Sequence, residues 1–273
     1  MPRLLDWVTR SADGDRSPLQ FTKSCPGFAP AWYRFLKLDG RHVLLLGNVC
    51  GTCGFFFERI DAVNGGMNFP DLQLRLAKGL VELDDDAIKT LLQVMPKSEY
   101  IIGLLRLKVE KVNPLGNNDY FAVEQESYNG GSYYNEPPHD PQAKYFRVSG
   151  RSGIDIKYPE LDGRAFDFIV PLAAEDSLDE ERVQFYEAKS ESGLAPTAIS
   201  LSKLDIKGPG DGGEVHWCLA HYLIDGHHKL EAAARTGQEI SLIAFIAIDH
   251  GISKREHVVN LLDSFDGPGQ VRS

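Results

Sequence analysis

The sequence predicts an α+β protein with a β-rich N-terminal module and a second domain in which strands alternate with helices. Two β-rich runs open the first half after residue 31, whereas helical and strand-like patterns alternate from residue 165 onward. A hydrophobic fraction of 42% in 273 residues is enough to build a core of that size. We expect the N-terminal module over residues 1–113, an irregular connection over 114–164, and the α+β domain over 165–273.

A β-hairpin is the first element that we expect. Residues 1–24 are polar and contain several turn-forming residues, so we interpret them as an irregular lead-in. Two β-rich runs then cover residues 32–38 and 42–49. The dipeptide Asp39-Gly40 between them suits a tight reversal, which predicts that the two runs pair.

A helix and another strand complete the predicted N-terminal module. Ile88, Leu91 and Met95 recur at helical spacing behind the acidic residues 84–86. Acidic side chains at the start of a helix complement its dipole, so we expect the helix to begin there. Residues 99–112 then predict a strand whose end alternates between apolar and polar side chains.

The second domain has a regular order of elements. Glycines at positions 193 and 237 end the two helical patterns, as expected for residues that adopt the left-handed conformation. The predicted order is β-α-β-β-α-β, with strands at 165–172, 195–206, 215–224 and 239–248 and helices at 178–193 and 227–236.

A strand-turn-helix motif, HYLIDGHHKLEAAARTG at residues 221–237, carries the main functional signal. Gly226 permits a sharp reversal after the buried strand, and a helix begins at once with His227, His228 and Lys229. The first amides of a helix have no intrahelical acceptor and lie at the positive end of its dipole. Together with imidazole and ammonium donors, these amides predict a pocket for a phosphate group.

The same residues have a purely structural interpretation, which remains open at this point. Asp225 is then an N-cap, the two histidines are surface residues, and Lys229 pairs with a nearby carboxylate. A cation in the first turn of a helix is unfavourable, so we expect a negative group to compensate Lys229.

Residues 165–250 resemble the ParB/sulfiredoxin superfamily in the order of their elements and in this motif. The motif is most similar to Asp-Gly-His-His-Arg in members such as the ADP-dependent free serine kinases. The resemblance implies that Asp225, Gly226, His227, His228 and Lys229 bind nucleotide phosphates. It also implies that acidic residues assist phosphoryl transfer.

Differences from that superfamily narrow the expected chemistry. Sulfiredoxins carry a nucleophilic cysteine where this chain has His227, which argues against reduction of a sulfinic acid. ParB partition proteins carry a Gly-Glu-Arg-Arg-like run at this point and a downstream helix-turn-helix, which argues against chromosome partition. The serine kinases have an arginine in place of Lys229, and an ammonium group lacks the bidentate geometry of a guanidinium.

Phosphoryl transfer needs a carboxylate to orient or deprotonate the acceptor, and usually Mg²⁺ on the phosphates. Glu175 and Asp176 follow the first strand of the second domain, and Asp225 precedes the motif helix. Glu175 and Asp176 also fit a structural role as the acidic entry to a helix. The candidate catalytic residues are therefore Asp225, Asp176, Glu175 and His228.

The sequence predicts a nucleotide-binding protein that acts as a phosphotransferase or a nucleotide phosphohydrolase. The expected ligands are ATP, ADP or CTP with Mg²⁺, and a small-molecule substrate. The alternative is a non-catalytic module that senses a nucleotide or binds a protein partner. Nuclease activity is a third hypothesis, but a net charge of −10 opposes binding of a nucleic acid.

The cysteines allow three interpretations. Cys50 and Cys53 have the spacing of a zinc knuckle, with Cys25 as a third ligand and His42 or Cys218 as a fourth. Plain reduced thiols are the second interpretation. A redox dithiol is the third, although such pairs usually open a helix and the residues after Cys53 predict extended chain.

The sequence predicts a cytoplasmic protein with no membrane partner. Asp6 and Arg10 interrupt the N-terminus before an apolar signal region forms. The longest apolar run, residues 240–248, is less than half of the about 20 residues that a membrane span requires.

Overall fold

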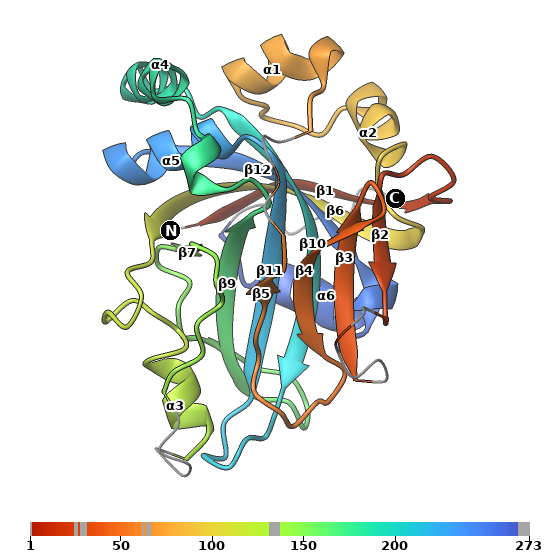
Figure 1. Ribbon diagram of the computed structural model, residues 1–273, viewed down its shortest axis with the longest axis vertical. Coiled ribbons are helices and arrows are strands. Elements are labelled where there is room, and N and C mark those ends of the chain that lie inside the picture. The colour runs from red at the N-terminus through yellow and green to blue at the C-terminus, as the bar shows by residue number, and fades with distance from the viewer. Residues whose placement is uncertain are drawn as a thin grey trace.

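Two β-sheets and the helices around them make up an α+β fold (Figure 1). The computed structural model describes residues 2–24, 27, 32–61, 63, 67–130 and 137–266. The first sheet is antiparallel and has four strands, and six strands of the second sheet close into a mixed barrel. The predicted α+β class is confirmed.

The barrel closes because its first and last strands also pair with each other. The order around it is β6 (Ser98–Lys111), β12 (Glu239–Ala247), β10 (Thr197–Lys207), β11 (His216–Asp225), β9 (Gly163–Pro171) and β7 (Phe146–Val148). Strand β7 then pairs with β6. Strands β10 and β12 are parallel, as are β9 and β11, and the other barrel pairs are antiparallel.

The sequence order predicted for the second domain is confirmed. Strand β9 leads to helix α4 (Glu180–Glu191), and strands β10 and β11 lead to helix α5 (His227–Thr236) and strand β12. Gly193 and Gly237 have φ values of 84° and 63°, which fit the predicted helix ends. Helix α6 (Arg255–Asp263) follows and was not predicted.

The predicted hairpin is also confirmed, in the four-stranded sheet of β2 (Leu19–Thr22), β3 (Tyr33–Leu38), β4 (Arg41–Asn48) and β5 (Glu58–Arg59). Leu38 pairs with Arg41, so Asp39 and Gly40 form a two-residue loop. Both loop residues have positive φ, as the tight turns of twisted hairpins require.

The prediction of an irregular N-terminal lead-in was wrong. Strand β1 (Arg3–Ala12) pairs with β6, and β2 begins at Leu19. A register shift between Leu4 and Asp6 interrupts the alternation of buried and exposed side chains. That interruption explains why the sequence pattern did not indicate a strand.

The barrel contains strands from both sides of the boundary predicted at residue 113. Strand β6 precedes that residue, yet it pairs with β12 and β7. The predicted connection over 114–164 contains β7, helix α3 (Glu124–Tyr128) and strand β8 (Ile154–Ile156), which pairs with β9. Long-range pairing of short strands leaves little periodic signal in a sequence.

Short helices follow strands of both sheets. The remaining elements are η1 (Pro70–Leu72), α1 (Gln73–Lys78), α2 (Asp85–Leu92), η2 (Glu175–Ser177) and η3 (Ile248–His250). Of these, η1, α1 and α2 connect the first sheet to β6 along the chain. The predicted helix behind the acidic run is confirmed as α2, where the Asp84 side chain accepts a hydrogen bond from the amide of Ala87 at 2.8 Å.

The barrel strands are buried on both faces. On one face, Phe168, Leu201 and Ala220 belong to a hydrophobic cluster with Leu44 and Phe55 of the N-terminal part. On the other face, side chains of β10, β11 and β12 pack with helices α5 and α6. Burial on both faces explains why these strands are nearly continuous apolar runs. Helices α4 and α5 lie side by side at one end of the molecule (Figure 1), and this end carries the candidate site.

Candidate functional site

The candidate site begins at the turn between β11 and α5. Gly226 is the N-cap of α5 and has a φ of 95°, in the left-handed region. A Cβ atom at this position would lie 2.7 Å from the Cβ of Ala198 on β10. Both the backbone conformation and the close approach therefore require glycine here.

The first turn of α5 has backbone donors that the helix itself does not use. The N–H groups of residues 227–229 have no acceptor within the helix, and the N-cap Gly226 has no side chain to bond them. Residues 225–229 line a cavity of about 340 Å³, together with Arg182 and Tyr186 of α4. Positive helix ends of this kind favour anionic ligands.

His227 is not one of the donors that the sequence predicted. Its ring is buried, and its Nε2 accepts a hydrogen bond from the amide of Ala173 at 3.1 Å. Burial, followed by the proximity of His228, lowers the pKa of His227 to about 3. The neutral ring therefore attaches the chain after β9 to the start of α5, which corrects its predicted role as a phosphate ligand.

His228 keeps the predicted position at the cavity. Its Nε2 accepts a hydrogen bond from the amide of Asp179 at 3.0 Å, so the proton of the neutral ring is on Nδ1. Burial is the main factor that lowers its pKa, and the charge of Arg182 lowers it further. His228 thus offers one N–H donor to a ligand without carrying a positive charge.

The side chain of Lys229 bonds to the protein itself and does not have the predicted role of a phosphate donor. Its Nζ donates to the carbonyl of Thr197 at 2.7 Å and lies 3.5 Å from the carboxylate of Asp225. The side chain is only 7% exposed, and burial lowers its pKa. These two oxygen groups are the negative compensation that we expected for a lysine in a first helical turn. They also correct the prediction that Lys229 is a direct phosphate donor.

Helix α4 begins at the same cavity as α5. Its N-cap is Asp179, whose side chain accepts hydrogen bonds from the amides of Glu181 and Arg182 at 2.9 and 3.3 Å. Arg182 is exposed and lines the cavity. Arg182 was not among the predicted site residues, although an arginine in the first turn of a helix is as unusual as Lys229.

Glu175 and Asp176 have different environments. Glu175 lines a neighbouring cavity of about 250 Å³ and accepts hydrogen bonds from Lys111 at 2.6 Å and from Lys144. Burial acts to raise the pKa of Glu175, but the two lysines outweigh it and hold that pKa below its usual range. Asp176 is exposed and lines neither of the two cavities. Of the two predicted carboxylates, Glu175 therefore has the better position for chemistry.

The two cavities share a wall. Ala173, Leu178 and His227 line both of them. Arg59 of the N-terminal sheet donates to the carbonyls of Pro171 and Leu172 at 2.7 and 2.8 Å, which fixes the end of β9 next to this wall. The arrangement places the start of α5 beside a cavity that is lined by two carboxylates, Glu175 and Glu231, and by two lysines, Lys111 and Lys144.

Cys50 and Cys53 form a disulfide. This bond replaces the predicted zinc knuckle, because sulfur atoms bonded to each other do not provide thiolate ligands. The other predicted ligand, Cys25, lies outside the described residues. His42 contacts the carbonyl of Ser24, and Cys218 is buried. Among the residues that the structure describes, no group of three or more candidate side chains has a geometry suited to a metal ion.

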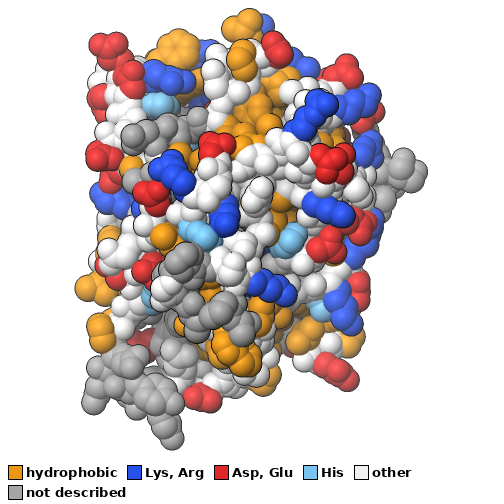
Figure 2. Space-filling model, turned by 45° about the vertical axis from the view of Figure 1, so that its right-hand side comes forward, with side chains coloured by type: hydrophobic (Ala, Val, Ile, Leu, Met, Phe, Trp, Pro, Cys, Tyr) orange, Lys and Arg blue, Asp and Glu red, His pale blue; other side chains and the backbone are white. Residues whose placement is uncertain are grey.

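Charges on the surface are mixed. Figure 2 shows Lys and Arg side chains interspersed with Asp and Glu over the face that it presents. An interspersed arrangement does not create the continuous positive field that a nucleic-acid backbone requires. Within the described part of the chain, none of the helices has the length and apolar character needed to span a membrane.

Comparisons with known proteins do not assign the chain to a family. No family model, curated protein or solved structure matches the chain.

The neutral state of His227 predicts a pH-dependent stability. Its pKa is about 3 in the folded protein and about 6.5 in the unfolded chain, so the unfolded state takes up the proton first as the pH falls. The contribution of neutral His227 to the free energy of unfolding is fully present above about pH 6.5 and is lost progressively toward pH 3. In His227→Gln, which keeps an acceptor for Ala173, the loss of unfolding free energy between pH 7 and pH 4.5 should be smaller by about 2 kcal/mol.

Chemical denaturation at several pH values measures this difference. Thr90→Val, on helix α2, removes no ionisable group and is the control, so it should keep the pH dependence of the unsubstituted protein. A His227→Gln protein with that same pH dependence would show that His227 is not held neutral.

Proposed function

We propose that this protein binds the phosphate groups of a nucleotide at the start of helix α5. The observation that carries the proposal is the uncapped first turn at residues 227–229, on the wall of a 340 Å³ cavity. Free amides at the positive end of a helix are suited to phosphate oxygens. The left-handed turn at Gly226 allows the ligand to approach the backbone closely.

Two side chains complete the proposed phosphate site. His228 supplies a neutral Nδ1–H donor, and Arg182 supplies a guanidinium from the facing helix α4. Lys229 acts indirectly, because its bonds to Thr197 and Asp225 hold the start of α5 against β10 and the end of β11. The site thus relies on backbone donors and one exposed cation.

The resemblance to the ParB/sulfiredoxin superfamily agrees with this proposal. The β-α-β-β-α-β order leads to the same turn and helix start that bind nucleotide phosphates in that superfamily. By this likeness, ATP, ADP or CTP with Mg²⁺ is the expected ligand. Asp225 belongs to the motif and lines the cavity, so it is our candidate for a group that contacts the bound Mg²⁺.

We further propose phosphoryl transfer to a small hydroxyl-bearing substrate in the neighbouring cavity. Glu175 lies at that cavity and would orient the hydroxyl group, while Lys111 and Lys144 hold its carboxylate in the ionised form. The second candidate function is nucleotide sensing without turnover. It is favoured by the bonds of Glu175 to two lysines, which reduce the basicity of the carboxylate.

Substitution of Arg182 tests the binding site. Arg182→Gln should weaken the binding of ADP about tenfold, because a charged hydrogen bond to phosphate is lost. Isothermal titration calorimetry with ATP, ADP and CTP in the presence of Mg²⁺ measures the change. Lys189→Gln on the same helix lies outside the cavity lining and should bind as the unsubstituted protein does. Equal affinities in the two variants would remove Arg182 from the site.

Substitution of Glu175 distinguishes transfer from sensing. With a panel of hydroxyl-bearing acceptors, Glu175→Gln should reduce turnover at least about a hundredfold and leave nucleotide affinity nearly unchanged. Asp176→Asn is the matched control, because Asp176 lines neither cavity. Nucleotide binding without turnover for any acceptor would favour the sensing function instead.

A further inference from the structure

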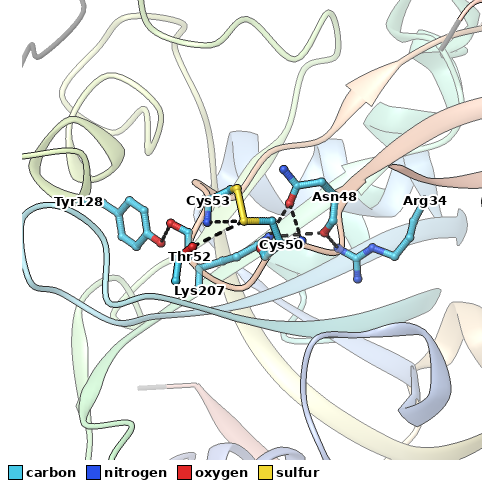
Figure 3. Close-up of a disulfide and its surroundings, with 7 residues drawn as sticks. All are labelled: Arg34, Asn48, Cys50, Thr52, Cys53, Tyr128 and Lys207. Atoms are coloured by element: carbon cyan, nitrogen blue, oxygen red, sulfur yellow. Dashed lines mark hydrogen bonds between the residues drawn. A yellow bond between two sulfur atoms is a disulfide. The ribbon is translucent and has the colours of Figure 1, made fainter. Parts of the chain in front are cut away.

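A second site is formed by the loop after β4, which carries the Cys50–Cys53 disulfide (Figure 3). Cys53 is exposed and Cys50 is half-buried. The loop lies outside the lining of both cavities at α5, so it does not belong to the proposed nucleotide site.

The two sulfur atoms have different surroundings. The Sγ of Cys50 accepts a hydrogen bond from the amide of Cys53 at 3.1 Å and lies 3.6 Å from the hydroxyl of Thr52. Both groups are in position to stabilise negative charge on Cys50 when the disulfide opens. Cys50 is therefore the better leaving group, and the exposed Cys53 is the sulfur that an incoming thiolate reaches.

The backbone of the loop is held by bonds that do not depend on the disulfide. The carbonyls of Cys50, Gly51 and Thr52 accept hydrogen bonds from Lys207 at 2.7 Å, from the amide of Gly208 at 2.7 Å and from the hydroxyl of Tyr128 at 2.8 Å. Asn48 accepts a hydrogen bond from the amide of Cys50 at 3.2 Å. Figure 3 shows Lys207, Asn48 and Tyr128 around the disulfide. These anchors keep both sulfur atoms close together after reduction, so the bond can form again.

A structural role for the disulfide is weaker by comparison. The two cysteines are three positions apart, so the bond closes a very short loop. Such a loop restricts the unfolded chain far less than a long one does. The anchors from β10 and α3 already fix the loop in the folded protein.

We propose that Cys50 and Cys53 are a redox-active pair that exchanges two electrons with an external dithiol. One thiolate of that dithiol attacks the Sγ of Cys53, the Cys50–Cys53 bond breaks, and Cys50 leaves as a thiolate. The second thiol of the dithiol loses its proton and attacks the dithiol sulfur that is bonded to Cys53. This step closes the disulfide of the dithiol and releases Cys53 as a thiolate. The two protons lost by the dithiol end on Cys50 and Cys53, and the dithiol becomes a disulfide.

Equilibration of the full chain with reduced and oxidised dithiothreitol tests this proposal. After alkylation and peptide mass analysis, Cys50 and Cys53 should change together from unlabelled to fully labelled and back as the ratio changes. The thermal unfolding midpoint should show that the protein remains folded in both states.

Three results would overturn the proposal. The pair could resist reduction in the folded protein at ratios that reduce it in urea. Reduction could unfold the protein, which would make the disulfide a structural link. The purified protein could contain stoichiometric zinc and no disulfide, in which case the cysteines are metal ligands.

A conservative substitution tests the role of Cys50 as the leaving thiolate. Thr52→Val removes the hydroxyl next to Cys50 and should slow reduction by dithiothreitol about threefold. Thr90→Val on helix α2 makes the same change far from the loop in sequence and should leave the rate unaltered. Equal rates in both variants would overturn the assignment of Cys50 as the leaving group.

Discussion

The turn at Gly226 is the constraint on which the candidate site depends. Gly226 reverses the chain at the end of β11 and lies so close to Ala198 of β10 that a side chain would clash. From this turn, His227 bonds to Ala173 after β9, and Lys229 bonds to Thr197 at the start of β10. The first turn of α5 is therefore fixed against two barrel strands. A rigid helix start of this kind presents its amides to a ligand without a further cost of ordering.

Strand β10 connects this site with the rest of the molecule. The buried carboxylate of Asp205 accepts hydrogen bonds from Arg34 on β3 at 2.7 and 2.8 Å and contacts Lys203 on its own strand. Burial lowers the pKa of Lys203 to about 7, while Arg34 and Asp205 are both held in their charged forms. A buried ion pair of this type is costly to break, by about 3–5 kcal/mol, because the remaining charge has no counterpart. This pair therefore joins the four-stranded sheet to the barrel.

The two proposed sites lie at opposite ends of β10. Thr197 at its start accepts the hydrogen bond from Lys229, and Lys207 at its end holds the loop of Cys50. Ten residue steps separate Thr197 from Lys207, which corresponds to about 33 Å along the strand, so the two sites are well separated. Loss of one site should therefore leave the other intact.

Periodicity was sufficient to predict much of the fold but not its closure. The order β9 to β12 followed from apolar runs bounded by glycines, since each element has a local signal. Strand β7 has three residues, and its role comes from pairing with β6 and β9, which are distant in sequence. No local pattern encodes such a pairing. This explains why the sequence did not predict a barrel that crosses residue 113.

The sequence indicated where the candidate site lies, but not the hydrogen-bond partners of all its side chains. The uncapped start at Gly226 and the placement of His228 agree with the sequence analysis. The inward direction of Lys229 depends on the carbonyl of Thr197, which lies 32 positions away. The spacing of Cys50 and Cys53 is compatible with zinc ligands and with a disulfide alike, so it could not decide between them.

Backbone amide chemical shifts measured during titration with ADP and Mg²⁺ test the central claim most directly. The account predicts that the largest shifts occur at the amides of His227, His228 and Lys229, and that they saturate together with the side-chain signal of Arg182. Saturable binding that leaves these three amides unchanged, or no binding of any nucleotide, would contradict it.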